Sequence, residues 1–280
     1  MRMQAHEVLD AAREALAAMS LKYLSGLAAD ARSDRALMFE VIDHYIRVAE
    51  IQGVPTSPSL GKLDEAEVSL ATADALVEGL LADGTNDVRG LELSATIRAY
   101  RTILADSQRR DADANRHLDG AVAQVDALLA HADVTPRQRF RGAFIYANLP
   151  LAANNLRRYD DGIRLARRFI ELVPGTTLGP SAIANGQSIL ANALRMRGDL
   201  EEAQVAIREA QATIGRGTDM GSQLNRYGLL LREGLILGED GGVSLDRPDD
   251  AVVPLREAFT LMNTRAQADP NDATSGSRTA

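Results

Sequence analysis

The chain has 280 residues, a formal net charge of -8, 45% hydrophobic residues, 4% aromatic residues and no Cys or Trp. The negative charge argues against a nucleic-acid-binding protein, which would need a basic stripe to displace counterions from phosphates. The lack of Cys excludes thiol nucleophiles, disulfides and thiolate metal sites. Frequent Ala, Leu, Glu and Arg favour closely packed helices, so we expect an all-α protein with essentially no sheet.

The first predicted element is an N-terminal helical cap. Apolar residues of Gln4–Ala31 lie near a common helical face, which indicates one or two amphipathic helices. We expect residues 1–35 to cover the end of a helical stack. The first ten residues contain acids where a secretion signal would have an apolar core, and no apolar stretch reaches the length of a membrane span. We therefore expect no membrane insertion.

A helix-pair pattern then repeats over residues 36–268. In the clearest copy, Gln187–Ala210, Gly198 stands in the turn, Ala203 opens the second helix and apolar residues follow at helical spacing. The other copies are Tyr45–Ala66, Tyr100–Ala121, Tyr146–Phe169 and Leu230–Ala251. The pattern resembles the tetratricopeptide repeat, in which each pair must stack on its neighbours to bury its apolar face. The resemblance implies a right-handed α-solenoid of about five helix hairpins.

A small residue is expected wherever the second helix of a pair approaches the first most closely. A side chain larger than methyl at this contact would overpack it, at a cost of about 1–3 kcal/mol. The expected positions of this contact are Ala66, Ala121, Gly162, Ala203 and Ala251, and Gly198 is the expected structural position in the turn. Acidic residues just before several of them favour the positive end of the helix dipole, so we assign those acids to capping and not to catalysis.

Three copies carry an extension of equal length between their paired helices. Two extensions, GVPTSPSLG from Gly53 and GEDGGVSLD from Gly238, are rich in residues that favour turns. The third, around Asp111–Asn115, is polar. Loop insertions on one face of a solenoid often form its binding edge, so we predict three long loops there. After the last copy the periodicity is lost, and residues 269–280 should form a disordered tail.

No residues with catalytic spacing emerge from the sequence. It contains no GxxxxGK[ST] phosphate loop, no GxGxxG and no GxSxG, and its four His residues show no ligand spacing. We therefore expect no enzymatic activity, no cofactor and no metal. A further hypothesis is an enzyme with an unrecognised site in the groove of the repeat array.

A binding surface is the better-supported function. In stacked helix pairs of this kind the first helix of each pair lines a concave groove, where Arg and Asn can hold a peptide backbone or a carboxylate. The groove candidates are Arg47, Arg98, Arg101, Asn148, Asn155, Asn192, Arg195 and Arg232. Together they predict a scaffold for a protein or peptide partner, extended or acidic. The alternative for each residue is that it only solvates the inner face.

Two segments also resemble a narrower group of proteins. Leu21–Ala66 and the closing stretch from Asp246 are similar to the tetratricopeptide half that lies C-terminal to the catalytic domain in large bacterial Hanks-type serine/threonine protein kinases. The matching residues are Tyr23, Leu24, Leu27, Ala28, Asp34, Leu37, Tyr45, Arg47, Val48, Gln52, Gly53, Pro55, Leu60 and Gly61.

The kinase resemblance implies an alternative function, a sensory or docking region of a kinase whose catalytic domain is absent from this chain. It also affects the expected location, which is cytoplasmic by default and extracytoplasmic if the chain belongs to a membrane-spanning kinase. The identity of the partner and the oligomeric state do not follow from the sequence.

Overall fold

The computed structural model describes residues 2–31, 34–55, 58–82, 87–215, 217 and 219–268. Every regular element in these ranges is a helix and none is a strand, which confirms the all-α fold class. The predicted tail over residues 269–280 lies outside the described residues. The chain divides between Leu156 and Arg157 into two compact units.

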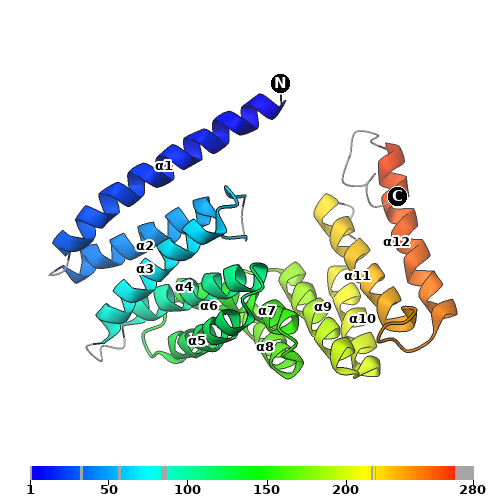
Figure 1. The fold of residues 1–280 in the computed structure, drawn as a ribbon. Helices are drawn as coiled ribbons and strands as arrows, with labels where there is room; N and C mark the ends of the chain where they lie inside the picture. Colours follow the sequence, from blue (N-terminus) through cyan, green and yellow to red (C-terminus); the bar gives the residue numbers. More distant parts are fainter. Residues whose placement is uncertain are drawn as a thin grey trace. The chain divides into compact units, whose positions relative to one another are not determined.

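The first unit contains α1 to α7, and its helices pack mainly on their neighbours in the sequence (Figure 1). Their bounds are α1 Arg2–Asp30, α2 Arg35–Gln52, α3 Leu63–Leu81, α4 Val88–Ser107, α5 Asp111–Ala130, α6 Pro136–Tyr146 and α7 Leu149–Asn155. The most extensive interfaces join α2 to α3 and α4 to α5. The N-terminal segment forms one helix, α1, which packs on α2 and buries Ala17 and Leu24.

The second unit contains α8 to α12 (Figure 1). Their bounds are α8 Tyr159–Leu172, α9 Pro180–Arg197, α10 Leu200–Ile214, α11 Met220–Gly238 and α12 Pro248–Ala268. The pairs α9/α10 and α11/α12 share the most extensive interfaces, and α8 packs on α9. None of the helices in the described ranges of either unit is long and apolar enough to cross a membrane.

The same backbone turn precedes α3, α5, α8, α10 and α12. Two positions before each of these helices, a residue adopts a left-handed conformation with φ between 55° and 104°. These left-handed residues are Gly61, Arg109, Arg157, Gly198 and Asp246. The next residue caps the helix, and where its angles are given they lie within φ -85° to -91° and ψ 62° to 70°. One turn geometry therefore recurs five times although only two of the left-handed residues are glycines.

The fourth residue of each helix that follows the turn is small and buried. These residues are Ala66, Ala114, Gly162, Ala203 and Ala251. The backbone N–H of each donates to the carbonyl of the capping residue at 2.9–3.1 Å, which closes the first helical turn. The left-handed residue and the small residue thus form a motif with a fixed spacing of five residues. The small residue lets the second helix approach its neighbours closely.

The expectation for the copy Tyr100–Ala121 was wrong in its register. Arg109 takes the left-handed place and Ala114 the first-turn place, while Ala121 is also buried but lies two helical turns further along α5. The residues from Asp111 to Asn115 are helical, so the third long loop does not exist. Both alanines face the core because they are seven residues apart on one helix. The sequence spacing therefore selected Ala121 for the first-turn position that Ala114 occupies.

The other two predicted loops are present and share one geometry. The N–H groups of Leu60 and Lys62 donate to the carbonyls of Ile51 and Gln52 at 3.0 and 2.8 Å. In the second loop the equivalent bonds run from Leu245 and Arg247 to Ile236 and Leu237 at 2.9 and 2.8 Å. A Cβ added at Gly53 or Gly238 would lie within 2.7 Å of the returning backbone. Each loop therefore folds back onto the end of its first helix, which requires a glycine there.

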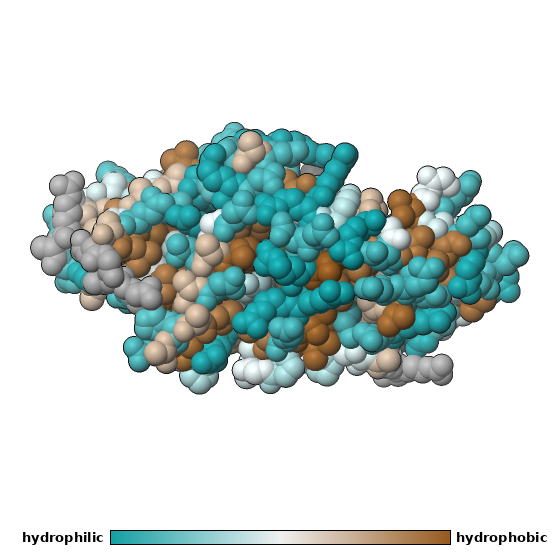
Figure 2. Space-filling view, turned by 90° about the horizontal axis from the view of Figure 1, so that it is seen from below, coloured by the Kyte–Doolittle hydropathy of each residue, from teal (hydrophilic) through white to brown (hydrophobic). Residues whose placement is uncertain are grey.

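The surface seen from below in Figure 2 is mainly hydrophilic, with apolar residues showing in separate patches. Large apolar side chains are exposed on several helices of both units. Examples are Met19 on α1, which is 72% exposed, Val205 on α10, which is 57% exposed, and Val253 on α12, which is 69% exposed. Single exposed apolar residues are normal on a protein surface and do not by themselves mark a binding site.

The shared turn predicts opposite effects for two substitutions. Gly198→Ala should lower the free energy of unfolding by about 1 kcal/mol, because an L side chain is disfavoured at positive φ. Arg109→Gly should raise it by up to about 1 kcal/mol, because the exposed Arg109 already bears that strain. Urea denaturation measures both changes. Shifts of the same sign would contradict a shared left-handed geometry.

The close contact at the first turn of α10 predicts a second effect. Ala203→Leu should destabilise the protein by about 1–3 kcal/mol, because Ala203 is completely buried and a larger side chain would overpack its contact. Ala212→Leu is the matched control, because Ala212 is exposed on the same helix and should change stability by less than about 0.5 kcal/mol. Thermal melting compares the two, and equal melting temperatures would refute the close contact.

Candidate anion-binding cavity

The arginines predicted as groove residues on α4 face α3. Nη1 of Arg101 lies 2.6 Å from Oδ2 of Asp74, and Nη2 of Arg101 lies 2.7 Å from Oε1 of Glu67. The side chains of Arg101, Glu67 and Asp74 are 16%, 18% and 10% exposed. Arg98 pairs with Asp74 as well, and with Glu78 at 2.6 Å. Both arginines therefore join α3 to α4, and their charges are balanced within the chain.

The same carboxylates set the protonation state of this cluster. Burial acts to lower the pKa of the Arg101 guanidinium, but the hydrogen bonds and charges of Glu67 and Asp74 together raise it. His117 of α5 is buried near Arg101, and burial, followed by the charges of Arg101 and Arg116, lowers the pKa of His117 to about 4. At pH 7 His117 is therefore neutral and adds no positive charge to the cluster.

The other three candidates of the first unit lie apart from this cluster. Arg47 is exposed and pairs with Asp43 of the same helix at 2.9 Å. Nδ2 of Asn155 donates to Oδ2 of Asp106 at 2.7 Å, and Asn148 is the residue that precedes α7. Of these three, only Arg47 carries a charge that solvent reaches freely.

In the second unit, Arg195 on α9 has internal partners. Its Nε donates to the carbonyl oxygen of Val243 at 2.7 Å, and its guanidinium also pairs with Glu239. The side chain of Arg195 is only 8% exposed. Arg195 therefore holds the loop between α11 and α12 against α9. Asn192 lies half-buried one turn before it.

A cavity of about 180 Å³ lies between α9 and α11, and Ile214 at the end of α10 also lines it. We call it the α9–α11 cavity. Its lining residues are Ser181, Ala184, Asn185, Ser188, Ile214, Leu224, Asn225, Gly228, Leu229 and Arg232. The lining thus combines hydroxyl and amide groups with apolar side chains and one cation, and it contains no carboxylate or histidine.

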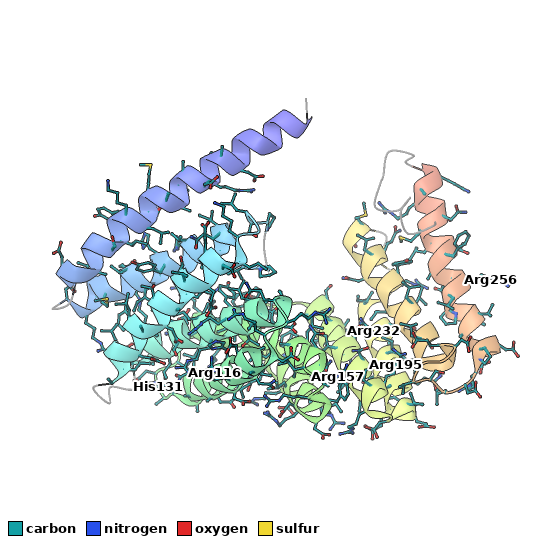
Figure 3. The ribbon with its side chains drawn as sticks, viewed as in Figure 1. Arg116, His131, Arg157, Arg195, Arg232 and Arg256 are labelled. Atoms are coloured by element: carbon teal, nitrogen blue, oxygen red, sulfur yellow. The ribbon has the colours of Figure 1, made fainter. Side chains whose placement is uncertain are left out.

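Arg232 is the predicted groove residue that lines this cavity. Its Nη1 donates to Oγ of Ser188, and no carboxylate among the described residues pairs with it. Figure 3 shows Arg232 and Arg195 in the same part of the second unit. Burial, and then the positive charge of Arg195, lower the pKa of Arg232. Its guanidinium stays charged at neutral pH because an arginine loses its proton only under strongly basic conditions. Arg232 is therefore a partly buried cation without an internal counterion.

The cavity walls add polar groups that the sequence did not single out. Asn185 and Asn225 stand on opposite helices and can donate hydrogen bonds from their amides, and Ser181 adds a hydroxyl. The lining residues recur at intervals of three and four along both α9 and α11. This spacing places them on one face of each helix, but the spacing alone does not show that the two faces meet across a cavity.

Comparison with known proteins does not identify a family for this chain. No protein-family model matches the chain, and no curated protein sequence matches it. The tetratricopeptide-like pattern and the link to serine/threonine kinases therefore stay predictions from the residues that suggested them. In the described part of the chain, no group of three or more His, Asp or Glu side chains is placed to hold a metal ion.

The α3–α4 cluster predicts that Arg101 is structural. Arg101→Met should lower the free energy of unfolding by about 3 kcal/mol, because it leaves the buried carboxylates of Glu67 and Asp74 without their main counterion. Arg47→Met, which breaks only an exposed ion pair, should change it by less than about 1 kcal/mol. Urea denaturation tests both. Equal losses would contradict the structural role of Arg101.

Proposed function

We propose that this chain is a non-catalytic interaction module, built from tetratricopeptide-like helix pairs, that binds a protein or peptide partner along the first helices of its pairs. The second unit anchors the partner through a carboxylate, from an Asp or Glu side chain or from a chain terminus, which enters the α9–α11 cavity. The observation that carries this proposal is the uncompensated charge of Arg232 at that cavity.

The contrast among the arginines supports a binding role for Arg232. Arg101, Arg98 and Arg195 are each balanced by carboxylates of the same chain. A partly buried charge without a counterion lowers stability, because it has lost part of its hydration without gaining an opposite charge. An anionic ligand would supply the missing charge, and a guanidinium binds a carboxylate through two parallel hydrogen bonds.

The size and composition of the cavity favour a side-chain-sized group over a metabolite. Pockets for small molecules usually measure about 300–1,000 Å³, and the α9–α11 cavity holds about 180 Å³. The amides of Asn185 and Asn225 can bond to the carboxylate or to the adjoining peptide, and Leu224 and Leu229 can pack on its methylene groups. The lining offers no acid–base pair, so it supports binding and not general acid–base catalysis.

Arg232→Met provides the test. The variant should be at least as stable as the parent in urea denaturation, because it removes an uncompensated charge, whereas Arg101→Met loses stability. Titration with N-acetylglutamate, followed by the amide resonances of Asn185 and Asn225, should give saturable shifts in the parent. The shifts should be at least about tenfold weaker in Arg232→Met, since a charged hydrogen bond is worth about 1.5–3 kcal/mol.

N-acetylglutamine N-methylamide is the matched ligand control, because it has nearly the same shape and carries no carboxylate at either end. It should not produce these shifts. If it binds as well as N-acetylglutamate, or if Arg232→Met retains the shifts, the cavity does not recognise a carboxylate. A loss of stability in Arg232→Met equal to that in Arg101→Met would show that Arg232 is structural.

A further inference from the structure

A second depression in the same unit has the opposite charge. It measures about 310 Å³ and lies between α8 and α10, with α9 at its floor. We call it the α8–α10 groove. Its lining residues are Arg167, Leu190, Leu194, Glu201, Glu202, Val205, Ala206 and Glu209. On α9, Leu190 and Leu194 face this groove, whereas Asn185 and Ser188 face the α9–α11 cavity.

The groove offers an apolar contact that the chain itself does not cover. Leu194 and Ala206 form a floor that is almost completely buried, and Val205 stands above it at 57% exposure. Covering the exposed valine removes apolar surface from water, which is favourable by about 25 cal/mol for each Å². An apolar side chain of a partner therefore has a defined place beside Val205.

The charges around this apolar contact are mainly negative. Glu201, Glu202 and Glu209 lie along α10, and the only cation in the lining is Arg167 of α8, which pairs with Glu202 at 3.3 Å. Glu209 accepts a long hydrogen bond of 3.4 Å from Gln187. Glu201 and Glu209 therefore have no cationic partner among the described residues. A positively charged ligand would balance them, and the net charge of -8 on the chain would attract it at longer range.

We propose that the α8–α10 groove docks a basic segment of a partner protein, which places one apolar side chain against Val205 and Leu194 and its lysines or arginines beside Glu201 and Glu209. This site is separate from the α9–α11 cavity and has the opposite preference for charge. It does not depend on the function proposed for Arg232.

Three short fluorescein-labelled peptides test the proposal by fluorescence anisotropy. The first consists of lysine and alanine with one central leucine, the second has serine in place of the leucine, and the third has glutamate in place of every lysine. The intact chain should bind the first peptide saturably. It should bind the second about tenfold more weakly, and the third should show no saturable binding.

Two groove variants and a matched control locate the site. Val205→Ser should weaken binding of the first peptide by about tenfold because it removes the apolar contact. The double variant Glu201→Gln/Glu209→Gln should weaken it by a similar factor at low salt and by less at high salt, because salt screens the exposed charges. Asp240→Asn/Asp249→Asn removes the same charge away from the groove and should leave binding within about twofold of the parent.

Circular dichroism melting confirms that each variant is folded. The proposal is overturned if the control double variant weakens binding as much as the groove double variant, because net charge alone would then explain the attraction. It is also overturned if the serine peptide binds as well as the leucine peptide, if Val205→Ser has no effect, or if the first peptide shows no saturable binding.

Discussion

The helix pairs α2/α3, α4/α5, α9/α10 and α11/α12 depend on a turn that sends the chain from the first helix into the second. A left-handed residue reverses the chain, the next residue caps the new helix, and a small residue in its first turn lets the backbone approach its neighbours closely. The spacing is the same at Gly61 and Ala66 as at Gly198 and Ala203. Packed helices tolerate little change in the distance between them because protein interiors are close-packed. The helices α9 and α11 are each the first helix of such a pair, and the cavity lies between them.

The arginines that are balanced by carboxylates of the same chain differ from Arg232, for which we propose a binding role. Between α3 and α4, Arg101 is enclosed by Glu67 and Asp74, and removal of either partner would leave a buried charge. Arg232 lacks such a partner and faces a cavity with polar walls. Because no carboxylate among the described residues pairs with Arg232, we propose that this cavity binds anions. The glutamates of α10 are the reason for which we propose the opposite preference for the groove on the other side of α9.

The sequence selected Arg232 together with arginines that the structure shows to be paired within the chain. The groove candidates are arginines and asparagines that the repeat pattern assigned to first helices, and the pattern does not show what lies opposite each of them. Arg98 and Arg101 meet carboxylates of α3, and Arg195 meets the loop that follows α11. Asn185 and Asn225 line the cavity but were not selected, because an isolated Asn on a helix gives no signal until the facing helix is known.

The sequence by itself determined the helical class, the positions of most helix pairs and the two long loops. These features follow from local physics: apolar periodicity, the turn-forming residues around Gly53 and Gly238, and the freedom of Gly198 to adopt positive φ. Only the tertiary structure decided that Ala114, and not Ala121, opens α5, because Arg109 adopts the left-handed turn without the glycine that would have revealed it. Only the tertiary structure decided which arginines are balanced, because the energy of a charge depends on groups that lie close in space and far apart in the sequence.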